Sequence, residues 1–202
     1  MSIYTTNLQG ENFTHRNLWQ TSDHLKDMGD TIAEGSAHQY KAASVFSVFA
    51  FEAYLNYLIS KIDEDIAKIE RKYFGPKGDY PGMKGKIKWI LEKLELPQAN
   101  YGSYPYQKLR EIISTRDSYA HGKPESCEIT ETHINPDHDI SPPWYTDSVS
   151  KEDIEQIMAC IMDITNNMHQ VAKSFLGSPI WWGEDALTGP LSYASGGTEI
   201  SS

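Results

Sequence analysis

The residues best suited to chemistry lie in the stretch STRDSYAHGK, residues 114–123. Arg116 is followed directly by Asp117, and His121 comes four residues after Asp117. Positions four apart share one face of a helix, so Asp117 and His121 can interact there. A guanidinium binds phosphate through paired donors, and an imidazole exchanges protons near neutral pH. This spacing suits acid–base chemistry on a phosphodiester.

The same residues also have a purely structural explanation. Arg and His are common in the last turn of a helix because they complement its dipole, and Asp117 can serve as a local ion-pair partner. Gly122 and Pro124 follow directly, as is typical of a helix end. The spacing by itself leaves both explanations open.

A second polar pair, Glu52 and Asn56, interrupts the most apolar segment of the chain, Ala42–Ile59. The two residues are four apart, so we expect them on one face of a buried helix, where polar side chains need partners. Arg116 is the candidate partner for Glu52. Such a pair could only fix the register of two helices, or Glu52 could orient Arg116 while Asn56 adds a donor to a site.

Hydrophobic periodicity predicts an all-α fold, and no segment alternates as a strand would. The expected helices are roughly Asn17–Glu34, His38–Lys72, Met83–Leu94, Pro105 to His121, and a last one that opens at Ser150. Ser150 and Asp153 form an approximate capping box at that start. We therefore predict a bundle of four to five helices.

The chain divides into three predicted parts. Residues 1–36 form an N-terminal helical arm, 37–176 the bundle domain, and 177–202 an irregular C-terminal tail. Within the bundle, residues 123–149 form a long loop rich in Pro, Asp, Ser and His.

Charge is distributed unevenly. The net charge is −10, but the window Lys68–Lys123 holds twelve Lys and Arg against six Asp and Glu. A basic middle between acidic flanks can steer a polyanion to one face, although a chance fluctuation on solvated helices would produce the same count. The Arg116 stretch lies inside this window.

Several classes of protein are disfavoured. Cys127 and Cys160 are too few for a disulfide framework, and the N-terminus lacks the pattern of a secretory signal. Ala42–Ile59 is borderline in length for a membrane span and carries two costly polar residues, so a buried helix is expected instead. These observations favour a cytoplasmic protein that does not enter a membrane.

No cofactor or metal is expected. The chain has no glycine-rich phosphate loop and no recognised nucleophile motif. Potential metal ligands occur in the long loop without a known spacing: Cys127, His133, Asp137, His138 and Asp139.

Arg116-Asp117-Ser118-Tyr119-Ala120-His121 resembles the R-x(4–6)-H signature of the HEPN superfamily, which lies at a helix end in an all-α domain. Phe51–Ile59, with its Glu and Asn, is similar to the long helix that many HEPN domains place before the motif. The resemblance covers roughly residues 38–176. One departure is Lys123, where a HEPN subgroup modified by its nucleotidyltransferase antitoxin carries Tyr.

The resemblance implies a metal-independent endoribonuclease that works as a homodimer with a shared cleft. In it His121 would act as general base or acid, Arg116 would stabilise the phosphate, and Asp117 would position the pair. RNA is the implied partner, with an antitoxin or regulatory protein as a further one. Basic residues expected to contact RNA are Lys84, Lys88, Lys108 and Lys123. Many HEPN relatives are catalytically silent, so a non-catalytic module that binds RNA, nucleotide or protein is the alternative.

Overall fold

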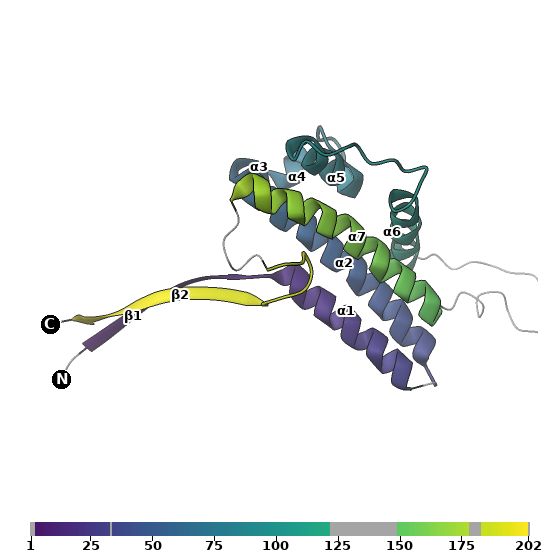
Figure 1. The fold of residues 1–202 in the computed structure, drawn as a ribbon, viewed down its shortest axis with the longest axis horizontal. Helices are drawn as coiled ribbons and strands as arrows, with labels where there is room; N and C mark the ends of the chain where they lie inside the picture. The colour runs from purple at the N-terminus through teal and green to yellow at the C-terminus, as the bar shows by residue number, and fades with distance from the viewer. Residues whose placement is uncertain (1–2, 33, 122–148, 178–182, 202) are drawn as a thin grey trace, which may run out of the picture.

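The computed structural model describes residues 3–32, 34–121, 149–177 and 183–201, and it is mostly helical (Figure 1). The elements are β1 (Ile3–Asn12), α1 (Thr14–Thr31), α2 (Ser36–Ile62), α3 (Glu64–Lys68), α4 (Glu70–Tyr73), α5 (Gly82–Lys93), α6 (Tyr106–His121), α7 (Lys151–Leu176) and β2 (Ser192–Ser201). The predicted all-α class is confirmed for the bulk of the chain, with a single two-stranded sheet in the described part.

The core of the bundle is built around α2. Along its length α2 packs on α1 and α7, and shorter contacts join it to α5 and α6 (Figure 1). Phe51, Tyr54, Leu55 and Leu58 in its second half are fully buried. Burial of each large apolar side chain contributes about 1.5–3 kcal/mol, so α2 supplies much of the stability.

Among the described helices, α2 alone is long and apolar enough to cross a membrane by length and composition. More than half of its most apolar stretch is buried inside the protein. That burial is the behaviour of a core helix, and it is compatible with a soluble protein.

The prediction of one helix from His38 to Lys72 is wrong in its second half. The helix ends at Ile62, and Asp63 adopts an extended conformation with φ −153° and ψ 98°. Its Oδ1 accepts hydrogen bonds from the amides of Asp65 and Ile66, both at 3.1 Å, and thereby starts α3. Asp competes with the helical backbone for hydrogen bonds, which explains the break.

The predicted first helix is displaced by three residues at each end, and its buried face differs from the expected one. Ile32, expected on the apolar face, is 52% exposed. The seam between α1 and α2 instead uses small residues. The Ser22 hydroxyl contacts the Ala43 carbonyl at 2.8 Å and the Ser47 hydroxyl at 2.7 Å. A Cβ at Gly29 would stand 2.5 Å from the Tyr40 ring.

The last helix follows its prediction closely. Ser150 caps α7, and its side chain and that of Asp153 form the expected capping box. Gly177 ends the helix in the left-handed region at φ 65°, where glycine is favoured. The α7 stripe that faces the core includes Ile154, Ile161, Ile164 and Met168, all buried.

A two-stranded antiparallel ribbon, absent from the sequence-based prediction, projects from the bundle and carries both chain ends (Figure 1). Its register runs from Ile3 opposite Ser201 to Asn12 opposite Ser192. The expectation that no strands occur is therefore wrong for both ends. The expected irregular tail holds only over 183–191. Pairing between residues almost two hundred positions apart leaves no local pattern, because each strand is satisfied only by the other.

Arg16 fastens the segment before β2 to the bundle. It is only 2% exposed, and its guanidinium lies 4.7 Å from the centre of the Phe13 ring. Nη1 donates to the Pro190 carbonyl at 3.0 Å and Nη2 to the Asp185 carbonyl at 3.5 Å. A buried cation thus holds two distant parts of the chain together through backbone acceptors.

Two buried histidines lie beside this segment. Burial lowers the pKa of His15 from 6.5 to about 3, and that of His169 from 6.5 to about 4. Nδ1 of His169 is 3.2 Å from the Tyr54 hydroxyl, and the His15 ring packs edge-on against Tyr54. Both imidazoles are therefore neutral in the folded protein at neutral pH.

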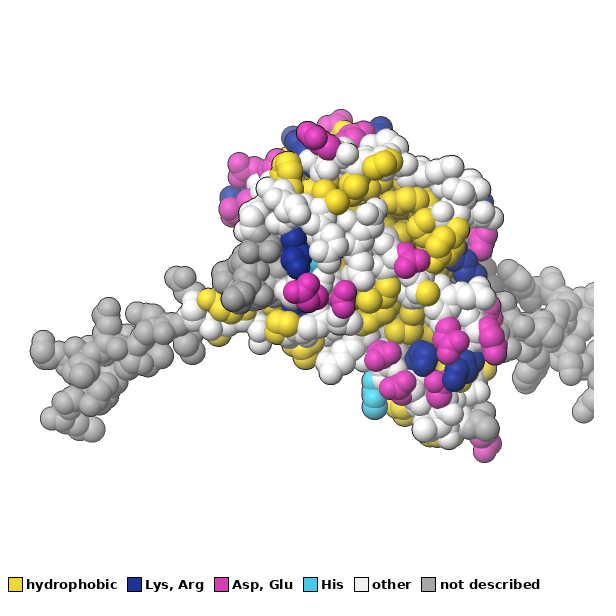
Figure 2. Space-filling view, viewed as in Figure 1, with side chains coloured by type: hydrophobic (Ala, Val, Ile, Leu, Met, Phe, Trp, Pro, Cys, Tyr) yellow, Lys and Arg dark blue, Asp and Glu magenta, His cyan; other side chains and the backbone are white. Residues whose placement is uncertain are grey.

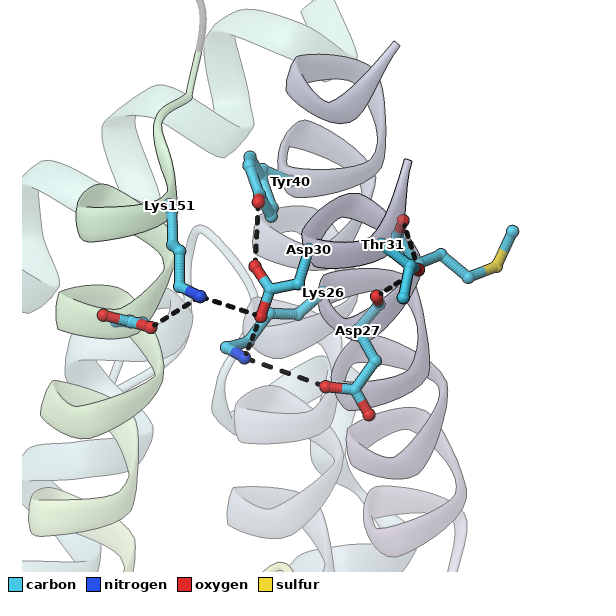
Figure 3. Close-up of polar contacts among 8 residues, drawn as sticks. Lys26, Asp27, Asp30, Thr31, Tyr40 and Lys151 are labelled. Carbon is cyan, nitrogen blue, oxygen red and sulfur yellow. Dashed lines mark hydrogen bonds and ion pairs between the residues drawn. The ribbon is translucent and has the colours of Figure 1, made fainter. Parts of the chain in front are cut away.

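At the other end of the bundle, Asp30 joins three helices (Figure 3). It accepts hydrogen bonds from Lys26 at 3.0 Å and from the Tyr40 hydroxyl at 2.8 Å, and Lys151 lies at 3.2 Å. These donors hold the pKa of Asp30 at about 2. Figure 2 shows the same end of the molecule, where acidic and basic side chains gather over the ends of α1 and α7.

We predict that the fold loses stability between pH 7 and pH 5. The unfolded histidines take up protons as the pH falls through 6.5, whereas folded His15 and His169 stay neutral to about pH 3 and 4. Each therefore removes about 2 kcal/mol from the free energy of unfolding at pH 5. Urea denaturation at the two pH values measures this loss. His169→Gln should weaken the pH dependence, and the same change at the exposed His24 should leave it intact.

Candidate functional site

Arg116 lies two-thirds of the way along α6, in a setting made by α2. Its side chain is 18% exposed, and Nη2 lies 3.7 Å from Oε2 of Glu52. Nη1 lies 3.1 Å from Oδ1 of Asp117, and the guanidinium faces the Phe49 ring at 5.8 Å. The structure thus brings together the Glu52–Arg116 pair that the sequence suggested. These contacts hold the guanidinium at one place on the surface.

The remaining motif residues lie at the exposed end of the same helix. Asp117 and His121 are both exposed, and His121 is the last residue of α6. The carboxylate of Asp117 turns to Arg116, so in this arrangement it serves the guanidinium rather than the imidazole.

The position of α6 is set by contacts at its start. The Tyr104 hydroxyl donates to Asp163 on α7 at 2.6 Å, and the Cys160 thiol lies 3.2 Å from the Pro105 carbonyl. Leu109 and Ile112 are buried beneath the helix. The motif at its far end therefore sits on a rigid element.

A cavity of about 240 Å³ opens beside Arg116, between α2, α6 and the start of α7. Arg116 and Lys108 supply its cations, and Glu111 and Asp153 its carboxylates. Hydroxyl groups and apolar side chains complete the lining, which is Ser44, Thr115, Tyr119, Ile112, Val149 and Ile157. Two cations with neighbouring hydroxyl donors are suited to a phosphate or sugar–phosphate group.

Lys86 is a member of the site that the sequence-based prediction missed. Its side chain is only 6% exposed. Nζ contacts Oε1 of Glu70 at 2.5 Å and Oδ1 of Asn56 at 2.7 Å, and Oε1 of Glu52 lies at 3.7 Å. A signal was present, since Lys86 stands four residues before Ile90 and so falls on the apolar stripe of α5.

The surroundings of Glu52 and Asn56 correct one expectation. Neither is deeply buried: the Glu52 side chain is 39% exposed and Asn56 is exposed. Glu52 uses one oxygen toward Lys86 and the other toward Arg116, and Asn56 serves Lys86. The polar pair thus lies at the rim of α2, where it links α5 and α6.

The predicted RNA-binding lysines do not form one patch. Lys84 lies over the Tyr101 ring at 5.2 Å, and Lys88 lies 3.8 Å from Glu92 on the same helix. Lys108 alone shares the cavity of Arg116. Lys123 lies outside the described residues.

No group of three or more His, Cys, Asp or Glu side chains is placed to hold a metal within the part of the chain that the structure describes. The loop residues considered as ligands, Cys127, His133, Asp137, His138 and Asp139, fall outside that part. Comparison with known protein families, curated proteins and solved structures finds no match to this chain. The geometry of the site and the sequence motif are therefore the basis for its interpretation.

We predict that Lys86→Met lowers the free energy of unfolding by about 1–3 kcal/mol, because Met keeps the buried methylenes but loses hydrogen bonds to charged partners. Glu52→Gln should cost less than about 1 kcal/mol, since its ion pairs are long and half exposed. Urea denaturation of both variants gives the comparison. An equal loss in the two would contradict the assignment of Lys86 as the centre of the network.

Proposed function

We propose that the protein is a metal-independent endoribonuclease of the HEPN type. The observation that carries the proposal is the cavity that brings Arg116 and Lys108 together, on the helix that ends in His121. The phosphate of an RNA strand would lie between the two cations. The motif spacing, the mostly helical fold and the pairing of Arg116 with Glu52 support this assignment.

The reaction is an internal transfer at phosphorus. His121 takes the proton from a ribose 2′-hydroxyl as that oxygen attacks the adjacent phosphate. The bond from phosphorus to the 5′-oxygen breaks, and the imidazolium returns the proton to that oxygen. Arg116 stabilises the negative charge that builds on the phosphate, and Asp117 keeps Arg116 in place. The products are a 2′,3′-cyclic phosphate and a 5′-hydroxyl.

In the same proposal the working unit is a homodimer in the cytoplasm, in which two α6 ends share one cleft. The long apolar helix α2 leaves part of its surface open beside the site, with Phe49 39% exposed. An antitoxin or regulatory protein would control such an activity, in a setting of bacterial defence.

A second candidate is a module that binds RNA without cleaving it. The observation in its favour is that both terminal nitrogens of Arg116 already face carboxylates, those of Glu52 and Asp117. A guanidinium that is paired in this way binds phosphate less strongly, because the carboxylates compete with the anion. This candidate predicts salt-dependent binding of RNA with no product.

We predict that His121→Ala and Arg116→Ala each reduce RNA cleavage by at least about 100-fold, because they remove a general base and a charge stabiliser. EDTA should have no effect. The assay is incubation of the purified wild type and variants with mixed RNA, followed by detection of 2′,3′-cyclic phosphate ends.

Circular dichroism must show that both variants keep their helical content. Lys151→Ala, a change in the polar network at the far end of α7, is the matched control for loss of a surface cation. Cleavage that persists in both motif variants would refute the catalytic assignment. Binding of RNA by a wild type that yields no product would favour the second candidate.

A further inference from the structure

A second cavity, of about 340 Å³, lies where β1 meets α1, against the second half of α2. Its polar lining consists of Asn12, Thr14, His15, Asn56, Tyr57 and Ser60. No Asp, Glu, Lys or Arg belongs to the lining in the described part of the chain. The cavity therefore suits an uncharged polar ligand, in contrast to the cavity at Arg116.

His15 gives this cavity an unsatisfied acceptor. The residue is 2% exposed, and its Nε2 is buried with no hydrogen-bond partner in the described residues. A backbone hydrogen bond at Ala186 serves the ring, so it falls to Nδ1 and leaves Nε2 with a bare lone pair. Leaving a buried polar atom unpaired costs about 1–3 kcal/mol, so the atom calls for a donor from outside the chain.

Asn56 supplies the complementary donor. Its Oδ1 accepts from Lys86 at 2.7 Å, which fixes the orientation of the amide and leaves the NH₂ group for another acceptor. Thr14 and Ser60 add hydroxyls, and Ser60 uses its own hydrogen on the Tyr57 carbonyl at 2.7 Å. The cavity thus presents an acceptor and a donor that are both held in place.

The walls favour a flat ligand. The rings of His15 and Tyr57 lie 4.7 Å apart at 39°, and Phe13 meets Tyr57 edge-on at 5.8 Å. Aromatic faces bind planar heterocycles by stacking, and amide side chains read their hydrogen-bonding edges.

We propose that this cavity binds a nucleobase, which donates a hydrogen bond to Nε2 of His15 and accepts one from the Asn56 amide. All four RNA bases carry a neighbouring donor and acceptor on one edge, and none is charged at neutral pH. A cavity of this volume has room for a base together with part of its ribose.

The position links the cavity to the proposed ribonuclease site. Asn56 follows Glu52 by four residues, which is a rise of about 6 Å along α2. Glu52 holds Arg116, so a strand with a phosphate at Arg116 would have a nearby base within reach of Asn56. This link rests on the proposed function, whereas binding of a base by itself does not.

The test is titration of the full chain with adenosine, cytidine, guanosine and uridine, followed by calorimetry and by the NMR signals of the His15 ring. We expect at least one nucleoside to bind and to shift those signals. Ala53→Phe, which fills the cavity from its half-buried α2 wall, should weaken binding at least tenfold. His15→Phe removes Nε2 while it keeps an aromatic ring, and it should do the same. His24→Phe, at an exposed histidine of α1, is the matched control and should bind as the wild type does.

Failure of all four nucleosides to bind, or equal binding by folded Ala53→Phe, would overturn the inference. The two proposals fail separately. Loss of cleavage in His121→Ala without any nucleoside binding would refute only the base cavity. Nucleoside binding by a protein that does not cleave RNA would refute only the ribonuclease.

Discussion

The burial of α2 is the constraint on which the other features depend. Its apolar side chains form the centre of the core, and α1, α5, α6 and α7 are positioned by packing on it. A helix that is apolar on nearly every side stabilises a bundle only when several neighbours cover it. The few polar residues on α2, among them Glu52 and Asn56, lie where this cover ends, and both candidate cavities are found beside them.

The two cavities differ in charge for a physical reason. The cavity at Arg116 is lined by paired cations and carboxylates near solvent, where water lowers the cost of charge. The cavity at His15 lies against a buried imidazole that burial keeps neutral. One helix thereby serves a site suited to phosphate and another suited to an uncharged ring. Lys86 lies between them, since it contacts Glu52 on one side and Asn56 on the other.

Prediction from the sequence succeeded where the signal was local. The capping box at Ser150, the end of α6 at the Arg116 motif and the apolar stripe of α7 follow from residues only a few positions apart. It failed where long-range packing decided the outcome. The seam of α1 uses Ser22 and Gly29 because close approach of two helices favours small residues, and periodicity does not show which face approaches. The break at Asp63 was locally readable as an N-cap but was obscured by the continuing apolar pattern.

The sequence by itself determined the helical class, the Arg116–His121 motif and the suggested partnership of Arg116 with Glu52, because helix geometry converts spacing into shared faces. Only the tertiary structure decided that Lys86 is buried among Glu52, Asn56 and Glu70, and that the chain ends pair as a ribbon. It also decided that His15 has an unused nitrogen in a cavity. These features join residues far apart in the chain, and burial and pairing arise only when the helices pack.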